Sequence, residues 1–156
     1  MSKKYIHYGS PAFYPKAFVP ITNFEVMNKP LGGLWASPVD AERGWHDWVK
    51  DNQFYPKRLE ENFTFELSQN ARVLELTPEN VLHLPLQENA ADWMIERSEA
   101  SPYGMIMGVD FEALAREWDV LECSLSEYPS LYWSLYGWDC DCILVLNPEV
   151  VVECLK

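Results

Sequence analysis

DCDCILVLNP, residues 139–148, contains a continuous apolar run at residues 143–146 that Asn147-Pro148 ends. An apolar run bounded by turn residues is typical of a strand that is covered on both faces of a sheet. Two acidic residues, Asp139 and Asp141, stand just before it. We therefore predict a central strand with an acidic entrance.

Shorter β-prone or alternating segments on the N-terminal side of this strand predict further strands. They lie at residues 5–8, 34–37, 63–67, 71–76 and 119–123. The segments 63–67 and 71–76 are separated by only a few polar residues, so we expect them to pair as antiparallel neighbours.

Helical spacing of apolar residues predicts helices between these strands. They are expected at residues 38–49, 77–84, 89–99 and 110–118. The last has the clearest pattern, because Asp110 is a preferred N-cap residue and Phe111, Leu114 and Trp118 share one face. Strands and helices do not alternate in the regular rhythm of a parallel nucleotide-binding sheet. We predict an α+β fold, with a mostly antiparallel, split sheet and peripheral helices.

The chain shows no internal repeat, low-complexity tract or long Gly/Ser linker, so residues 1–156 are expected to form a single domain. Its formal net charge of −12 would repel a phosphate backbone unless the few Lys and Arg side chains were concentrated in one patch. Nucleic acid is therefore a disfavoured partner. The sequence shows neither a signal peptide nor a run of about 20 apolar residues, which predicts a cytoplasmic protein that is not inserted in a membrane.

The cysteines, at positions 123, 140, 142 and 154, are expected to be thiols in a reducing cytoplasm. Cys140 and Cys142 are two residues apart, which on a strand places both on one sheet face and suits small core side chains. Zinc sites more usually combine a C-x-x-C pair with further Cys or His pairs. We expect no metal site.

Three short motifs occur in a characteristic order. They are His7-Tyr8-Gly9 on the first predicted strand, Gly32-Gly33-Leu34-Trp35-Ala36-Ser37-Pro38 on the second, and Asp139-Cys140-Asp141 before the last. In type and order these motifs resemble those of the NAD-dependent ADP-ribosyltransferases. The resemblance covers motif order across the chain rather than continuous identity. It implies an ADP-ribosyltransferase-like fold, with NAD as the substrate and no metal.

The resemblance also implies roles for single residues. In this family the first motif holds a ribose of NAD, the second lines the nicotinamide pocket, and an acidic residue opens the third strand. His7 would then contact a ribose, and the Gly9 backbone would bind the nicotinamide amide. Tyr8 would stack on the flat nicotinamide ring. Gly33, Trp35 and Ser37 would lie beside the dinucleotide.

The acid that immediately precedes the apolar strand, Asp141, is the first candidate for the catalytic residue, and Asp139 is the second. A carboxylate is needed because the anomeric carbon becomes positively charged when nicotinamide departs. The family more often has Glu at this position, and Asp reaches less far.

The same residues also have structural explanations. His7 can be a core-edge histidine with one backbone partner, the two glycines can form an ordinary turn, and Asp139 and Asp141 can be solvated. We expect mono-ADP-ribosyl transfer from NAD to a macromolecular acceptor, most simply a protein. NAD hydrolysis, an inactive binding module of the same fold and a small acidic interaction protein of a mobile element remain alternatives, and the oligomeric state stays open.

Overall fold

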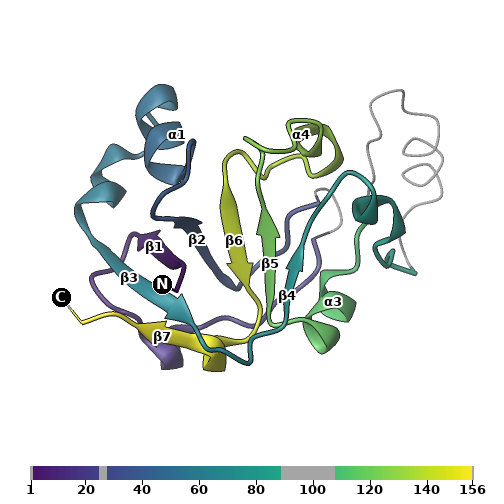
Figure 1. The fold of residues 1–156 in the computed structure, drawn as a ribbon, viewed down its shortest axis with the longest axis horizontal. Helices are drawn as coiled ribbons and strands as arrows, with labels where there is room; N and C mark the ends of the chain where they lie inside the picture. The colour runs from purple at the N-terminus through teal and green to yellow at the C-terminus, as the bar shows by residue number, and fades with distance from the viewer. Residues whose placement is uncertain (1, 25–27, 89–107, 156) are drawn as a thin grey trace.

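The computed structural model describes residues 2–24, 28–88 and 108–155. These ranges form a small α+β domain with a mixed seven-stranded sheet (Figure 1). The strands are β1 (Lys4–Tyr8), β2 (Leu34–Pro38), β3 (Asn62–Leu67), β4 (Val73–Glu75), β5 (Val120–Cys123), β6 (Cys142–Val145) and β7 (Val151–Glu153). The helices are α1 (Trp45–Asn52), α3 (Phe111–Glu117) and α4 (Leu131–Ser134), with 3-10 turns η1 (Pro15–Ala17), η2 (Pro56–Glu60), η3 (Asn80–His83) and η4 (Pro148–Val150). None of these helices is long and apolar enough to cross a membrane.

The strand order in the sheet is β4-β5-β6-β2-β1-β3-β7. Only β4 and β5 pair in parallel, and every other neighbouring pair of described strands is antiparallel, which confirms the mostly antiparallel prediction. All four residues of β6 are buried, as the apolar run predicts for a central strand. Figure 1 shows β4, β5 and β6 side by side, β3 and β7 running at a different angle, and the helices at the periphery.

Three of the predictions differ from the structure, one in strand pairing, one in where a helix begins and one in helix type. Residues 63–67 and 71–76 do not pair with each other, because β3 lies between β1 and β7 while β4 joins the far edge through β5. The predicted helix 38–49 begins only at Trp45, where the side-chain oxygen of Ser37 accepts a hydrogen bond from the Trp45 amide. The predicted helix 77–84 is the 3-10 turn η3, and the predicted helix 89–99 lies outside the described residues.

The helix predicted at residues 110–118 is confirmed as α3, and its cap explains where it begins. Asp110 accepts a hydrogen bond from the Ala113 amide at 2.9 Å, the contact expected of an N-cap aspartate. Phe111 and Leu114 are buried against the larger of two apolar clusters. The helix is therefore fixed at both its start and its apolar face.

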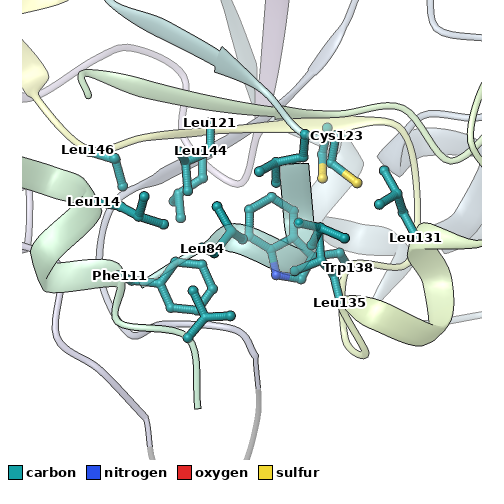
Figure 2. Close-up of a cluster of buried hydrophobic side chains, with 14 of the residues drawn as sticks. Leu84, Phe111, Leu114, Leu121, Cys123, Leu131, Leu135, Trp138, Leu144 and Leu146 are labelled. Atoms are coloured by element: carbon teal, nitrogen blue, oxygen red, sulfur yellow. The ribbon is translucent and has the colours of Figure 1, made fainter. Parts of the chain in front are cut away.

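Trp138 lies at the centre of the larger apolar cluster, surrounded by Leu121, Leu135 and Leu144 (Figure 2). It is 1% exposed, and its indole N–H donates to the carbonyl oxygen of Asn28 at 2.6 Å. A buried tryptophan whose polar edge is satisfied is a strong anchor. It fixes the chain immediately before the acidic stretch that leads into β6.

Asp119 joins the strands at one end of the sheet. Its carboxylate accepts hydrogen bonds from the Arg72 backbone and guanidinium and from the Asn147 side chain. These hydrogen bonds, above all those from the Arg72 side chain, hold the pKa of the Asp119 carboxyl well below its usual range. Because Arg72 precedes β4 and Asn147 follows β6, one buried carboxylate links the chain ends of neighbouring strands.

Candidate functional site

Most of the predicted site residues meet at one cavity of about 240 Å³ beside the centre of the sheet. Its lining includes six of the eight residues proposed from the sequence, namely His7, Tyr8, Gly33, Trp35, Ser37 and Asp139. The remaining two, Gly9 and Asp141, do not line it. Segments that lie more than a hundred residues apart in the sequence therefore contribute to one site.

Strand pairing explains this convergence. β2 lies between β1 and β6, with Ile6 opposite Ser37 and Trp35 opposite Leu144. His7 on β1 therefore comes next to Trp35 on β2, and the residues that enter β6 pass along the other side of Trp35. The cavity forms where these three strands come together, and Trp45 at the start of α1 adds a further wall.

His7 has a defined tautomer in this arrangement. Its Nδ1 lies 2.6 Å from the carbonyl oxygen of Trp35. A carbonyl can only accept a hydrogen bond, so Nδ1 carries the proton, and Nε2 of the neutral ring is an acceptor. Burial lowers the pKa of His7, the Trp35 hydrogen bond partly opposes this, and Arg58 lowers the pKa further. At neutral pH the ring therefore presents an acceptor suited to a ligand hydroxyl.

The Trp35 ring forms the aromatic wall of the cavity. It packs edge-on against Trp138, with ring centroids 4.8 Å apart, and Lys29 Nζ lies 5.0 Å from its centroid. Lys29 and Arg58 both line the cavity, whereas Asp139 is the only acidic residue among the described residues that line it. The cavity thus has a local excess of positive charge in a chain whose net charge is −12. Such a cavity suits an anionic ligand with a flat ring.

Lys29 and Arg58 were not among the residues proposed from the sequence. They lie in segments without a recognisable motif, and each is a long cation near a proline, which is no signal for a binding site. Their only sequence signal is scarcity, because cations are half as numerous as acids in this chain. Only the fold shows that two of them share a cavity.

The two candidate acids occupy different surroundings. Asp139 is half-buried in the cavity, and within the described part of the chain its carboxylate has no hydrogen-bond or ion-pair partner. Asp141 is buried, and its carboxylate accepts hydrogen bonds from the Ser126 amide at 2.8 Å, the Ser126 hydroxyl at 2.5 Å and the Arg43 amide at 3.2 Å. Asp139 is therefore available to a ligand in the cavity, while Asp141 holds two loops together.

Asp141 also lies at the edge of a separate hollow of about 310 Å³. Other acidic residues line this hollow, including Asp40, Glu75 and Glu122, and the Lys3 ammonium forms an ion pair with Glu122. The Asp141 amide donates to the Arg43 carbonyl oxygen at 2.8 Å, which completes its contacts with that loop. The structure does not bring Asp141 together with His7 and Trp35.

The glycines and Ser37 have local structural roles as well. The Gly9 amide donates to the Glu61 carbonyl oxygen at 2.8 Å, so this N–H is already occupied. Gly33 has a φ of +72°, and a Cβ there would lie 2.5 Å from Leu144 Cδ1. The positive φ and the lack of room for a Cβ both favour glycine immediately before β2. Ser37 accepts from the Trp45 amide at 2.8 Å and so caps α1 at the cavity wall.

A second hollow, of about 460 Å³, adjoins the first cavity and shares His7, Gly33 and Trp35 with it. Most of its other lining is apolar or aromatic and comes from segment 12–19 and from Phe63. The His7 ring lies 5.2 Å from the Phe63 ring, at the boundary between the two hollows. Together they make an elongated site with one charged end and one apolar end.

The described histidines, cysteines and acids include no group of three or more that is arranged to hold a metal ion. The four cysteines are free thiols, and burial raises the pKa of Cys123 to about 12. Compared with known proteins, the chain matches no family model, no curated protein and no solved structure.

Proposed function

We propose that this chain is a mono-ADP-ribosyltransferase that transfers ADP-ribose from NAD to a macromolecular acceptor. The observation that carries the proposal is the meeting of His7, Trp35 and Asp139 in one cavity that also contains Lys29 and Arg58. These five side chains offer a hydroxyl-binding ring nitrogen, an aromatic wall, a free carboxylate and two cations. An NAD molecule has hydroxyls, two flat rings and a pyrophosphate, so each group of the site has a matching group on the ligand.

The size of the site supports the same proposal. A dinucleotide is long, and the 240 Å³ cavity alone is below the usual range for ligand pockets of about 300–1,000 Å³. The adjoining 460 Å³ hollow extends the site past His7 and Trp35 into an apolar region. One nucleoside would occupy the charged cavity, the other the apolar hollow, and the pyrophosphate would lie near the cations.

In the proposed reaction, NAD supplies a ribose whose bond to nicotinamide breaks, so that positive charge develops at the anomeric carbon. The Asp139 carboxylate would stabilise that charge, because a preorganised negative group in a partly buried site lowers the barrier. His7 Nε2 would hold a ribose hydroxyl and fix the sugar. A nucleophilic atom of the acceptor then bonds to the anomeric carbon, nicotinamide leaves with the bonding electron pair, and the acceptor releases a proton. We assign the catalytic carboxylate to Asp139, with Asp141 as the alternative.

An inactive nucleotide-binding module is the second candidate, and the short reach of an Asp side chain favours it. Such a module would bind NAD through His7, Trp35, Lys29 and Arg58 without releasing nicotinamide. Both candidates place the protein in the cytoplasm, where NAD is present. Under the transferase proposal a protein is the simplest acceptor.

Thermal denaturation with and without millimolar NAD tests the proposal. A ligand that binds only the native state stabilises it by RT ln(1 + [L]/Kd), which is about 2.7 kcal/mol at a hundredfold excess over Kd. We expect a shift in melting temperature that His7→Ala abolishes, and nicotinamide release that Asp139→Asn abolishes. A shift without nicotinamide release would identify the binding module. No shift at any NAD concentration would contradict both and favour the small acidic interaction protein.

A further inference from the structure

Asn28 is a buried polar residue that immediately precedes the cavity cation Lys29. It is 4% exposed, so its amide has to find its partners within the protein. Its Nδ2 donates to the Ser134 carbonyl oxygen at 3.0 Å, and its Oδ1 accepts from the Val109 amide at 3.2 Å. The Asn28 side chain therefore joins three segments that are far apart in the sequence.

The backbone of Asn28 adds a contact to the wall of the cavity. Its carbonyl oxygen accepts from the Trp138 indole at 2.6 Å, and the Trp138 ring packs edge-on against Trp35. This carbonyl belongs to the peptide unit that joins Asn28 to Lys29. The chain at Lys29 is thus fixed to the same tryptophan that supports the aromatic wall.

The residues that follow Lys29 are also held in place. Pro30 disfavours helical backbone conformations at Lys29, because its ring would clash with them. Leu31 exchanges two backbone hydrogen bonds with Thr22, at 2.9 and 3.0 Å. Lys29 therefore lies between two fixed points and has little backbone freedom.

The result of this arrangement is a placed cation. The Lys29 side chain is half-buried, and its ammonium lies over the Trp35 ring, 5.0 Å from the centroid. No carboxylate in the described part of the chain forms an ion pair with Lys29. A long side chain loses conformational entropy when it is held, and a ligand binds more tightly when the protein has already restricted the group it meets.

We propose that Asn28 is a positioning residue, whose buried amide fixes the loop that places the Lys29 ammonium over the Trp35 ring before any ligand binds. The consequence for NAD rests on the proposed transferase function, in which this ammonium meets the pyrophosphate. Asn28 lines neither the cavity nor the adjoining hollow, so it acts through Lys29 and does not touch the ligand. A leucine would fill nearly the same space, so packing alone does not require an amide here.

NMR of protein whose lysines carry ¹³C-methyl groups tests the placement without any ligand. Reductive methylation keeps the positive charge of lysine, and the Lys29 signal is the one that Lys29→Arg removes. The face of an aromatic ring shields nearby protons, so this signal should lie upfield of those from exposed lysines such as Lys50. In Asn28→Ala it should move most of the way to the position of the exposed lysines.

Asn147→Ala is the matched control. The Asn147 side chain also makes two hydrogen bonds, to the Asp119 carboxylate and from the Glu149 amide, and it follows β6 rather than lining the cavity. This variant should lower the melting temperature and leave the Lys29 signal unchanged. Asn28→Leu removes the same hydrogen bonds as Asn28→Ala without leaving a void. It should give the same shift and keeps the measurement available if Asn28→Ala fails to fold.

A double-mutant cycle on NAD affinity, measured by calorimetric titration, tests the consequence for the ligand. Asn28→Ala should weaken NAD binding about fivefold when Lys29 is present and less than about twofold in a Lys29→Ala background. Similar losses in both backgrounds would show general damage to the site and overturn the proposal. A Lys29 signal that is not shifted in wild type, or that stays in place in the Asn28 variants, would overturn it as well. Failure of wild type to bind NAD would contradict the transferase proposal alone, because the lysine signal by itself decides the role of Asn28.

Discussion

The Nδ1 of His7 and the carbonyl oxygen of Trp35 lie 2.6 Å apart and join two neighbouring strands at the boundary between the two hollows. This contact fixes the proton on Nδ1 and leaves Nε2 as an acceptor. It also determines how the site responds to pH, because the lowered pKa means that folding disfavours the charged ring.

The His7 pKa predicts an acid-sensitive term in stability. The unfolded ring has a pKa near 6.5 and the folded ring a lower one, so the unfolded state binds more protons between these two values. Stability from this group is therefore present above pH 6.5 and is lost as the pH falls through the folded pKa. Melting temperatures measured between about pH 7.5 and 5 should fall more for wild type than for His7→Asn. Parallel curves for the two proteins would show that His7 does not titrate differently on folding.

Replacing Asp139 and replacing Asp141 should have different effects on stability and on nicotinamide release. Asp139→Asn should leave the melting temperature unchanged and abolish nicotinamide release. Asp141→Asn should lower the free energy of unfolding by about 1.5–3 kcal/mol, because charged hydrogen bonds to Ser126 and Arg43 weaken. Denaturant unfolding and a nicotinamide assay measure both effects. Loss of release at unchanged stability in Asp141→Asn would instead identify Asp141 as the catalytic carboxylate.

The cavity cations should contribute to affinity for NAD. Lys29→Ala and Arg58→Ala should each weaken NAD binding about tenfold, because a hydrogen-bonded charge pair with a phosphate oxygen contributes roughly 1–2 kcal/mol. Calorimetric titration measures this. The matched control is Arg116→Ala, which removes the same charge from an exposed position on α3. Equal losses in all three variants would mean that only the overall charge matters.

Asp119 should govern stability in more acidic solution. Its folded pKa lies below its unfolded value, so its contribution is present above about pH 4 and is lost as the pH falls further. Asp119→Asn should destabilise the protein by about 1–3 kcal/mol at neutral pH and flatten this part of the pH profile. Urea unfolding at a series of pH values provides the measurement. An unchanged profile would indicate that the hydrogen bonds from Arg72 and Asn147 stabilise the charged and neutral forms equally.

Sequence patterns predicted most of the fold, because each correct element has a strong local signal. The buried run of β6 and the Asp110 cap of α3 are set by neighbouring residues alone. Strand pairing is different, since β3 finds its partners in β1 and β7, which are distant in the sequence. The late start of α1 also depends on a distant contact, because Arg43 is held by Asp141 and the turn before the helix cannot become helical.

The site was predictable in part for the same reason. His7, Trp35 and Asp139 belong to motifs, and their meeting follows from the order of the motifs along three strands. The choice between Asp139 and Asp141 depends on which way each side chain points just before β6, and periodicity does not settle that outside a strand. The amide and hydroxyl of Ser126 donate hydrogen bonds to the Asp141 carboxylate, and nothing in the sequence around Ser126 indicates this contact.

The separation of charge between cavity and surface has a kinetic consequence. An anion approaching the protein first meets the field of an acidic surface and feels the attraction of Lys29 and Arg58 only at close range. Added salt screens the distant repulsion, whose range is about 8 Å at physiological ionic strength, and so speeds association. It screens the partly buried contacts less but still hastens release. The two rate constants would therefore rise together, and equilibrium affinity would conceal a strong dependence on salt that stopped-flow traces resolve.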